Sequence, residues 1–232
     1  MPPPKGHPSS RRKPEEKKEA EDIFVEKTLE LTRWAKANTQ ALILAGVVVG
    51  ILVAGGLYYA NYRSSLREQA IAQLEQVQST VGFGDREAAK IQLNQYLGQF
   101  EGTVYALEAR LILGQVLLED GDPEGAMEAL APAVRAMDDE PIGIQAAFLM
   151  ASAYEEAQRL EDAERLFLRI ADTSDLSFQI REALSGAARL RTAAGDYSGA
   201  ATLYRDVLST MEADDPARSY WEMRLAEASA RG

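Results

Sequence analysis

The chain has 232 residues with 25 basic and 36 acidic side chains, giving a formal net charge of −11. Residues 1–38 carry 9 basic and 7 acidic residues, whereas the remainder carries 16 and 29. An acidic surface argues against nucleic acid or anionic lipid as a partner, because phosphate groups need a basic surface. Cysteine is absent, so disulfide bonds and thiolate metal sites are excluded.

The first 22 residues are rich in Pro, Lys, Glu and Ser and have almost no apolar side chains. Such a segment cannot bury enough surface to offset its conformational entropy, so residues 1–22 are predicted to be a disordered tail. Residues 23–38 follow, and their apolar side chains lie toward one side of a helix, namely Ile23, Phe24, Leu31, Trp34 and Ala35. We expect an amphipathic juxtamembrane helix here, either lying on the membrane surface or docking a cytoplasmic partner.

Residues 37–62 carry no charge, and residues 41–60 are 20 consecutive apolar, small or aromatic residues. About 20 helical residues cross the ~30 Å hydrocarbon core of a bilayer, so residues 41–60 are predicted to be a single transmembrane helix. A cleaved signal peptide and a buried core helix are the alternatives. About 40 residues precede the run, and Tyr58, Tyr59 and Tyr62 near its end suit a membrane interface better than a cleavage site.

Basic residues near the span indicate its orientation. Lys27, Arg33 and Lys36 lie before it, and Arg63 and Arg67 lie after it. The positive-inside tendency then places the N-terminus in the cytoplasm and the large C-terminal part outside it. Within the span, a stripe of small residues at a spacing of four would permit close packing against another membrane helix; its members are Gly46, Gly50 and Ala54.

Beyond the span the sequence repeats with a period of 37 residues. Alanines recur at this interval, and a larger apolar residue stands four positions after each; the alanines are Ala89, Ala126, Ala163 and Ala200, and the larger residues are Leu93, Leu130, Phe167 and Tyr204. Twelve residues before the last three alanines stand the small residues Gly114, Ala151 and Ala188. Gly-Asp pairs at 84–85, 121–122 and 195–196 mark turns, where Gly takes the left-handed conformation and Asp caps the next helix.

Small residues on successive helices let the helices approach closely, and the larger residue one turn on fills the space between them. This pattern resembles the tetratricopeptide repeat, whose common length is 34 residues, with about three residues added between pairs here. The resemblance implies an all-α solenoid over residues 64–232, with about four helix pairs and a capping helix. The expected helices are 64–81 with 85–99, 103–119 with 123–137, 141–157 with 160–172, 176–193 with 197–211, and 214–230.

The first helix of each pair lines the inner wall of such a solenoid. The repeat places twelve residues on this wall as a candidate partner-binding groove: Glu108, Leu111, Gln115, Leu118, Glu119, Gln145, Phe148, Ser152, Glu155, Glu182, Ser185 and Arg189. The mixture of acidic and apolar side chains suits protein segments with basic and hydrophobic character. The alternative is a merely solvated groove.

No reactive constellation accompanies the repeats. The single histidine, His7, lies in the tail, so neither a histidine metal site nor a Ser-His pair can form in the repeat region. Gly82-Phe83-Gly84 lacks the third glycine of a dinucleotide loop. We therefore expect a non-enzymatic protein with no catalytic residues, metal, cofactor or small-molecule substrate.

Three features together suggest a narrower family: Trp34-Ala35-Lys36-Ala37-Asn38, the Gly-rich span followed by Tyr58 to Arg63, and Thr103 to Gly114 opening the second pair. Over about residues 20–211 the chain resembles the YfgM-like ancillary subunits of the bacterial SecYEG translocon. The resemblance implies an inner-membrane protein with a periplasmic repeat domain, which engages translocon subunits, periplasmic chaperones or secretory chains. The alternative is a scaffold or adaptor for another envelope complex, such as one for cell division or wall assembly.

Overall fold

The computed structural model describes Lys27, Leu29, Glu30 and residues 32–232. The predicted tail, residues 1–22, and the start of the predicted 23–38 helix lie outside these residues. Lys27, Leu29, Glu30 and residues 32–37 are helical, and Asn38 forms a turn. The described chain belongs to two compact units, Met1–Arg63 and Ser64–Gly232, which are considered separately below.

Helix α2 runs without a break over Thr39–Gly82 and contains the whole predicted span. Residues 61–65 hold no Pro or Gly, so nothing in the sequence interrupts the helix between the span and the first repeat. Among the described residues, this is the one helix long and apolar enough to cross a bilayer, with a mean hydropathy of 2.4 in its most apolar window. None of that window is buried within the protein.

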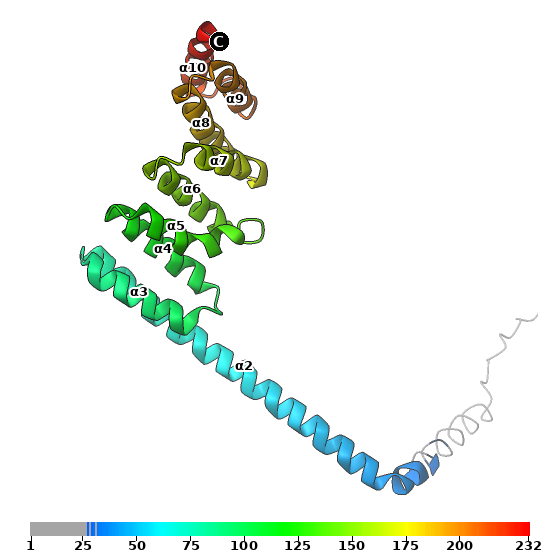
Figure 1. The fold of residues 1–232 in the computed structure, drawn as a ribbon. Helices are drawn as coiled ribbons and strands as arrows, with labels where there is room; N and C mark the ends of the chain where they lie inside the picture. The colour runs from blue at the N-terminus through cyan, green and yellow to red at the C-terminus, as the bar shows by residue number, and fades with distance from the viewer. Residues whose placement is uncertain (1–26, 28, 31) are drawn as a thin grey trace, which may run out of the picture. The chain divides into compact units, whose positions relative to one another are not determined.

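The second unit is helical throughout its regular structure, with no strand among its described residues. After the last part of α2, the helices follow one another in chain order (Figure 1). Their bounds are α3 Arg86–Phe100, α4 Tyr105–Glu119, α5 Pro123–Arg135, α6 Pro141–Glu156, α7 Leu160–Thr173, α8 Ser177–Ala193, α9 Tyr197–Ser209 and α10 Arg218–Arg231. The all-helical solenoid predicted from the repeat is confirmed.

Tight turns join the two helices of each pair at the predicted positions. Gly84, Gly121 and Gly195 adopt φ of 80°, 75° and 83°, the left-handed region that glycine enters without a steric penalty. The following aspartates cap the next helix, as in the hydrogen bond of 2.9 Å from the Gly125 N–H to Asp122 Oδ1. The third turn differs, because Gln158 takes φ of 60° and the residue after it makes no side-chain cap.

The capping helix begins later than expected, at Arg218 rather than near residue 214. Pro216 disfavours helical geometry in the residue before it, and the Asp215 carboxylate accepts a hydrogen bond of 2.8 Å from the Ala217 N–H. The Arg218 guanidinium then donates to the backbone carbonyls of Leu208 and Met211 at 3.2 and 3.3 Å. These bonds satisfy carbonyls at the end of α9 and tie α10 onto it.

The repeating alanines lie in the interior of the helix pairs. Ala89, Ala126, Ala163 and Ala200 are each 0% exposed. The two helices of the second pair approach closely at Gly114 of α4, where an added Cβ would lie 2.5 Å from Leu130 Cγ of α5. The small-residue pattern therefore marks the helix contacts that the repeat predicts.

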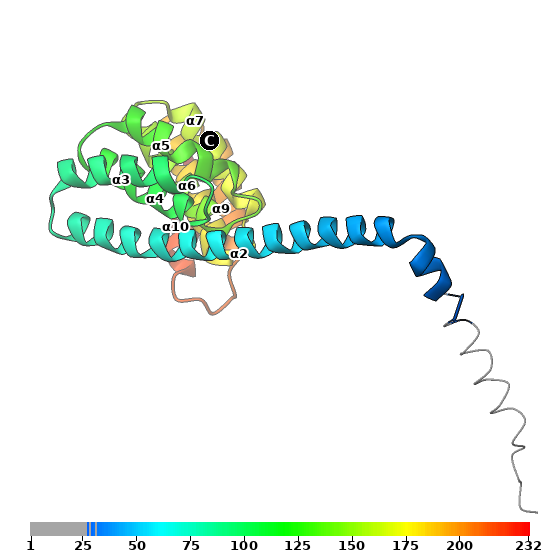
Figure 2. The same cartoon turned by 90° about the horizontal axis from the view of Figure 1, so that it is seen from below.

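The second unit buries its apolar side chains in two large clusters. Ala70, Leu74 and Val77 of α2 pack with residues of α3 and α4, including Leu93, in the first cluster. Figure 2 shows this part of α2 running beside α3. The second cluster runs from α5 through α9 to Ala228 of α10. Residues 64–232 thus form a continuous stack with apolar contacts between successive helices.

Candidate functional site

An open hollow of about 600 Å³ lies along the first helices of the second, third and fourth pairs and ends against α10. Hereafter "the groove" means this hollow. Helices α4, α6 and α8 provide most of its wall, and α7, α9 and α10 add the rest. Its lining residues are Leu111, Gln115, Gln145, Phe148, Leu149, Ser152, Glu155, Phe167, Glu182, Ser185, Gly186, Arg189, Tyr204, Tyr220, Trp221 and Arg224.

Nine of the twelve residues that the repeat places on the inner wall line the groove, namely Leu111, Gln115, Gln145, Phe148, Ser152, Glu155, Glu182, Ser185 and Arg189. The other three do not. Glu108 accepts a hydrogen bond of 2.9 Å from Gln78 of α2, Glu119 pairs with Arg86, and Leu118 packs against the larger apolar cluster. The wall near the first pair therefore holds the helices together instead of lining the groove.

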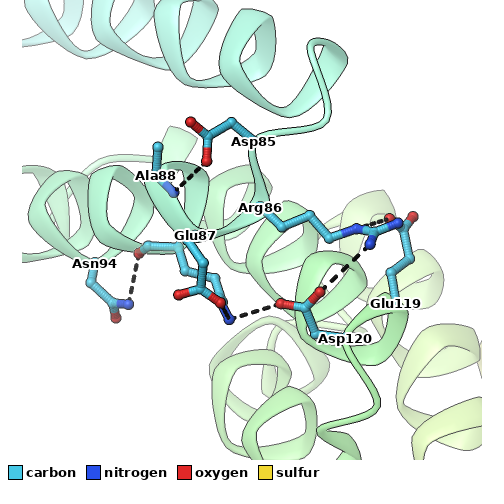
Figure 3. Close-up of polar contacts among 8 residues, drawn as sticks. Asp85, Arg86, Glu87, Ala88, Asn94, Glu119 and Asp120 are labelled. Carbon is cyan, nitrogen blue, oxygen red and sulfur yellow. Dashed lines mark hydrogen bonds and ion pairs between the residues drawn. The ribbon is translucent and has the colours of Figure 1, made fainter.

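A set of ion pairs joins the first pair to the second at this end (Figure 3). Arg86 of α3 reaches both Glu119 and Asp120 at the end of α4, at 3.3 and 3.7 Å. Lys90 Nζ lies 2.7 Å from Asp120 and 2.5 Å from Glu87. The hydrogen bonds to Asp120 and then to Glu87 raise the pKa of Lys90 above its ordinary value. These partly exposed contacts add to the apolar packing of α4 against α3.

Helix α8 contributes small side chains to the groove. Leu111 and Phe148 correspond in the 37-residue repeat to Ser185, and Ile112 and Leu149 correspond to Gly186. At Gly186 an added Cβ would lie 2.9 Å from the Phe167 ring, so this ring rests directly on the helix backbone. The Phe167 ring thus takes the place of the side chain at Gly186, and only the Ser185 position loses a large side chain to the groove.

Five aromatic rings line the groove. The Phe148 and Phe167 rings lie 6.3 Å apart between centroids. At the α10 end, Trp221 lies 6.2 Å from Tyr204 and 4.8 Å from Tyr220. Rings at these separations and tilted to one another attract beyond simple area burial, which makes a stable apolar wall.

The inner-wall assignment missed the aromatic residues because they come from second helices and from the capping helix. Phe167 and Tyr204 occupy the large apolar position of the repeat, which predicts filling between helices rather than a lining role. The feature of the sequence that could have revealed them is the small size of Ser185 and Gly186. The Phe167 ring packs directly onto Gly186 and lines the groove beside Ser185.

Two arginines that line the groove already have hydrogen-bond partners within the protein. Arg189 of α8 donates two hydrogen bonds to the Glu155 carboxylate of α6, at 2.6 and 2.7 Å, and this pairing raises the pKa of Arg189. Arg224 donates to the Tyr204 hydroxyl at 3.1 Å and to Glu227 at 2.7 Å. The hydrogen bond to Tyr204 raises the pKa of Arg224. Both guanidinium groups therefore stay charged and engaged.

One carboxylate of the groove remains without a counter-ion. Glu182 lies exposed on α8, one turn before Ser185 and Gly186, and makes no ion pair with any residue in the described part of the chain. The described residues also contain no group of three or more His, Asp or Glu side chains arranged to hold a metal ion. The chemistry that the groove offers is apolar contact, one free negative charge, and hydrogen bonding through Gln115, Gln145 and Ser152.

A stack of helix pairs with such a groove defines a repeat protein of the kind that binds other proteins. The sequence matches the tetratricopeptide repeat-like domain family over residues 32–230, and the chain belongs to that family. Domains with this fold are in general non-enzymatic scaffolds for protein interaction. None of the curated proteins compared with the chain matches it.

Solved structures agree on the fold. The tetratricopeptide-like repeats of a kinesin light chain from Podosopora anserina are 18% identical, with a TM-score of 0.55, over 70% of this chain and 86% of that one. A crystal structure of MamA protein is 16% identical, with a TM-score of 0.55, over 69% and 81% of the two chains. At this level of identity the likeness establishes the helical repeat fold alone.

Proposed function

We propose that this protein is a membrane-anchored interaction module that assists protein translocation or folding at the bacterial Sec translocon. The observation that carries the proposal is the union of one uninterrupted apolar helix with a helical repeat unit that has an open groove. The groove engages translocon subunits, periplasmic chaperones or secretory chains, and the apolar helix keeps it at the membrane.

The exposure of the apolar helix supports anchoring. Leu44, Ile51 and Leu52 are 67%, 66% and 68% exposed, and their neighbours are similarly uncovered. Soluble proteins rarely expose an apolar surface of this extent, whereas a bilayer would bury it. The tyrosines at positions 58, 59 and 62 then lie at the headgroup level.

The small-residue stripe offers a second contact within the membrane. An added Cβ at Gly46 or Gly50 would meet nothing within 4 Å, so this side of the helix is open to a neighbour. Ala54 extends the same side by one turn. Packing of another membrane helix against this stripe would hold the chain beside the translocon.

The basic residues before the span favour a cytoplasmic N-terminus, which puts the repeat unit in the periplasm. The absence of cysteine suits that oxidising compartment. The acidic surface of residues 64–232, with 29 acidic and 15 basic side chains, keeps the unit away from the anionic bilayer surface. These features agree with the resemblance to YfgM-like translocon subunits.

Photo-crosslinking from the groove in intact bacterial membranes tests the proposal. A photoreactive amino acid at Phe148 or Leu111 is expected to trap translocon subunits, periplasmic chaperones or secretory chains. The matched control is the same substitution at Ile91 of α3, which is 59% exposed and lies outside the groove. Adducts confined to cell-division or wall-assembly proteins would replace the proposal with the scaffold alternative, and equal adducts from Ile91 would refute a role for the groove.

A further inference from the structure

We propose that the groove recognises a polypeptide segment with a bulky aromatic side chain next to a lysine or arginine. The aromatic side chain enters the space above Ser185, beside the Phe167 ring, and the cation pairs with Glu182. This inference rests on the proposed function of the groove as a protein-binding site and assigns the chemistry of the bound segment.

The steric part follows from the break in the repeat. In the second and third pairs, Leu111 with Ile112 and Phe148 with Leu149 supply two large side chains where the fourth pair has only a hydroxymethyl group and a hydrogen. The Phe167 ring occupies the side-chain position of Gly186, so only Ser185 leaves room, and Phe167 with Gly186 adds an apolar floor to the groove beside it. A ring inserted from a partner would restore at Ser185 the bulk that Leu111 and Phe148 supply in the earlier pairs.

The walls suit an aromatic ring in particular. Phe148 and Trp221, each half-buried, face the groove from α6 and α10. Ring–ring contacts at offset or edge-on geometry add to the free energy of burial, so a flat ring gains more here than an aliphatic chain of similar area.

The preference for a lysine or arginine follows from the ion pairs that the charged residues of the groove already make. Glu155 is paired with Arg189, and Arg224 is paired with Glu227, which also lies 3.3 Å from Arg231. Among the charged residues that line the groove, Glu182 makes no ion pair with any part of the chain that the structure describes and can attract a counter-ion. The 29 acidic and 15 basic residues of 64–232 add a long-range field of the same sign, which steers cations towards the unit and repels acidic segments.

Intrinsic fluorescence provides a direct readout. The chain has two tryptophans, Trp34 and Trp221, so Trp34→Phe leaves Trp221 in the groove wall as the single tryptophan. The full chain with Trp34→Phe, purified in non-ionic detergent, is titrated with short capped peptides. The peptides differ only at two adjacent positions: Phe-Arg, Ala-Arg and Phe-Glu.

The Phe-Arg peptide is expected to shift the Trp221 emission in a saturable way. Replacing its Phe by Ala should weaken binding at least tenfold, because a buried aromatic ring is lost. Replacing its Arg by Glu should weaken binding further at low salt, and high salt should reduce the difference.

Variants of the protein separate the two parts. Ser185→Phe fills the space with the residue type that the third pair carries at this position, so Phe-Arg and Ala-Arg should then bind with equal, weak affinity. Glu182→Gln should weaken Phe-Arg two- to fivefold, as an exposed ion pair allows. The control is Glu161→Gln on the exposed surface of α7, outside the groove lining, which should leave the affinity unchanged.

The outcomes distinguish this inference from the proposed function. Saturable binding of all three peptides with equal affinity, unaffected by Ser185→Phe and Glu182→Gln, would overturn the aromatic-plus-cation assignment while leaving a peptide-binding groove. A Trp221 emission that no peptide changes would overturn the assignment, and with no groove adducts in membranes it would remove the proposed function too.

Discussion

Adding a single methyl group at Gly114 should destabilise the repeat unit, although glycine-to-alanine changes inside helices usually stabilise. Alanine is favoured over glycine in a helix interior by about 1 kcal/mol. At Gly114, however, the new Cβ would lie 2.5, 2.6 and 2.9 Å from three carbons of the Leu130 side chain. Carbon atoms pack best at roughly 3.5–4.0 Å, so Leu130 would have to retreat by about 1 Å.

Leu130 is 0% exposed and belongs to the larger apolar cluster, so this movement would press it against neighbouring buried side chains. Overpacking of a filled core costs about 1–3 kcal/mol, which exceeds the gain in helix propensity. Gly114→Ala should therefore lower the free energy of unfolding by about 1 kcal/mol. The measurement is urea unfolding of residues 64–232, which form a compact unit, followed by circular dichroism.

Gly98 of α3 provides the matched control, because an added Cβ there meets nothing within 4 Å. Gly98→Ala should raise the free energy of unfolding by about 0.5–1 kcal/mol. Leu130→Val should relieve part of the clash, so the double variant with Gly114→Ala should be more stable than the sum of the single effects predicts. Equal stabilisation by Gly114→Ala and Gly98→Ala would refute the close helix contact.

Three further predictions concern the same unit. Ala126→Leu should overpack its helix pair and cost about 1–3 kcal/mol, and an unchanged melting temperature would contradict the assigned repeat. Gln158→Gly should raise the free energy of unfolding in urea by about 0.5–1 kcal/mol, because Gln158 holds φ at 60° where the other turns have glycine. A lower free energy of unfolding would show that the Gln158 side chain contributes more than the backbone strain costs. Burial, and then the Glu108 carboxylate, raises the pKa of Tyr96 to about 12, above the unfolded value of about 10. The stability that Tyr96 contributes is therefore full below pH 10 and is lost as the pH rises towards 12. Between pH 9 and pH 11, the free energy of unfolding should fall by about 1 kcal/mol less in Tyr96→Phe than in the unaltered protein. Equal falls in both proteins would contradict the burial of the hydroxyl.

The turns and the helix pairs could be predicted from the sequence because their causes are local and repeated. The Gly-Asp pairs set left-handed turns and caps, and small residues every 37 positions mark the helix contacts. In the third turn, only the 37-residue repeat predicts the left-handed conformation, because the residue types do not. Gln158 takes the glycine conformation in the same place, although neither the glycine nor the aspartate is present.

The lining of the groove was only partly predictable, because it depends on what each helix meets across the stack. The repeat placed Glu119 on the inner wall, but its charge is used by Arg86 of the neighbouring pair. Trp221 reaches the groove because Pro216 and Asp215 delay the start of α10 and Arg218 fixes the helix onto α9. Such long-range contacts leave no periodic trace in the sequence.

The central claim is that one helix crosses the inner membrane and holds the repeat unit on its periplasmic side. Site-specific thiol labelling tests it most directly, since the chain has no cysteine of its own. A membrane-impermeant maleimide added to cells with a permeabilised outer membrane should label Ser229→Cys, and should label Ser9→Cys only after the inner membrane is broken. Labelling of Ser9→Cys alone in unbroken cells, or of neither variant until lysis, would contradict the claim.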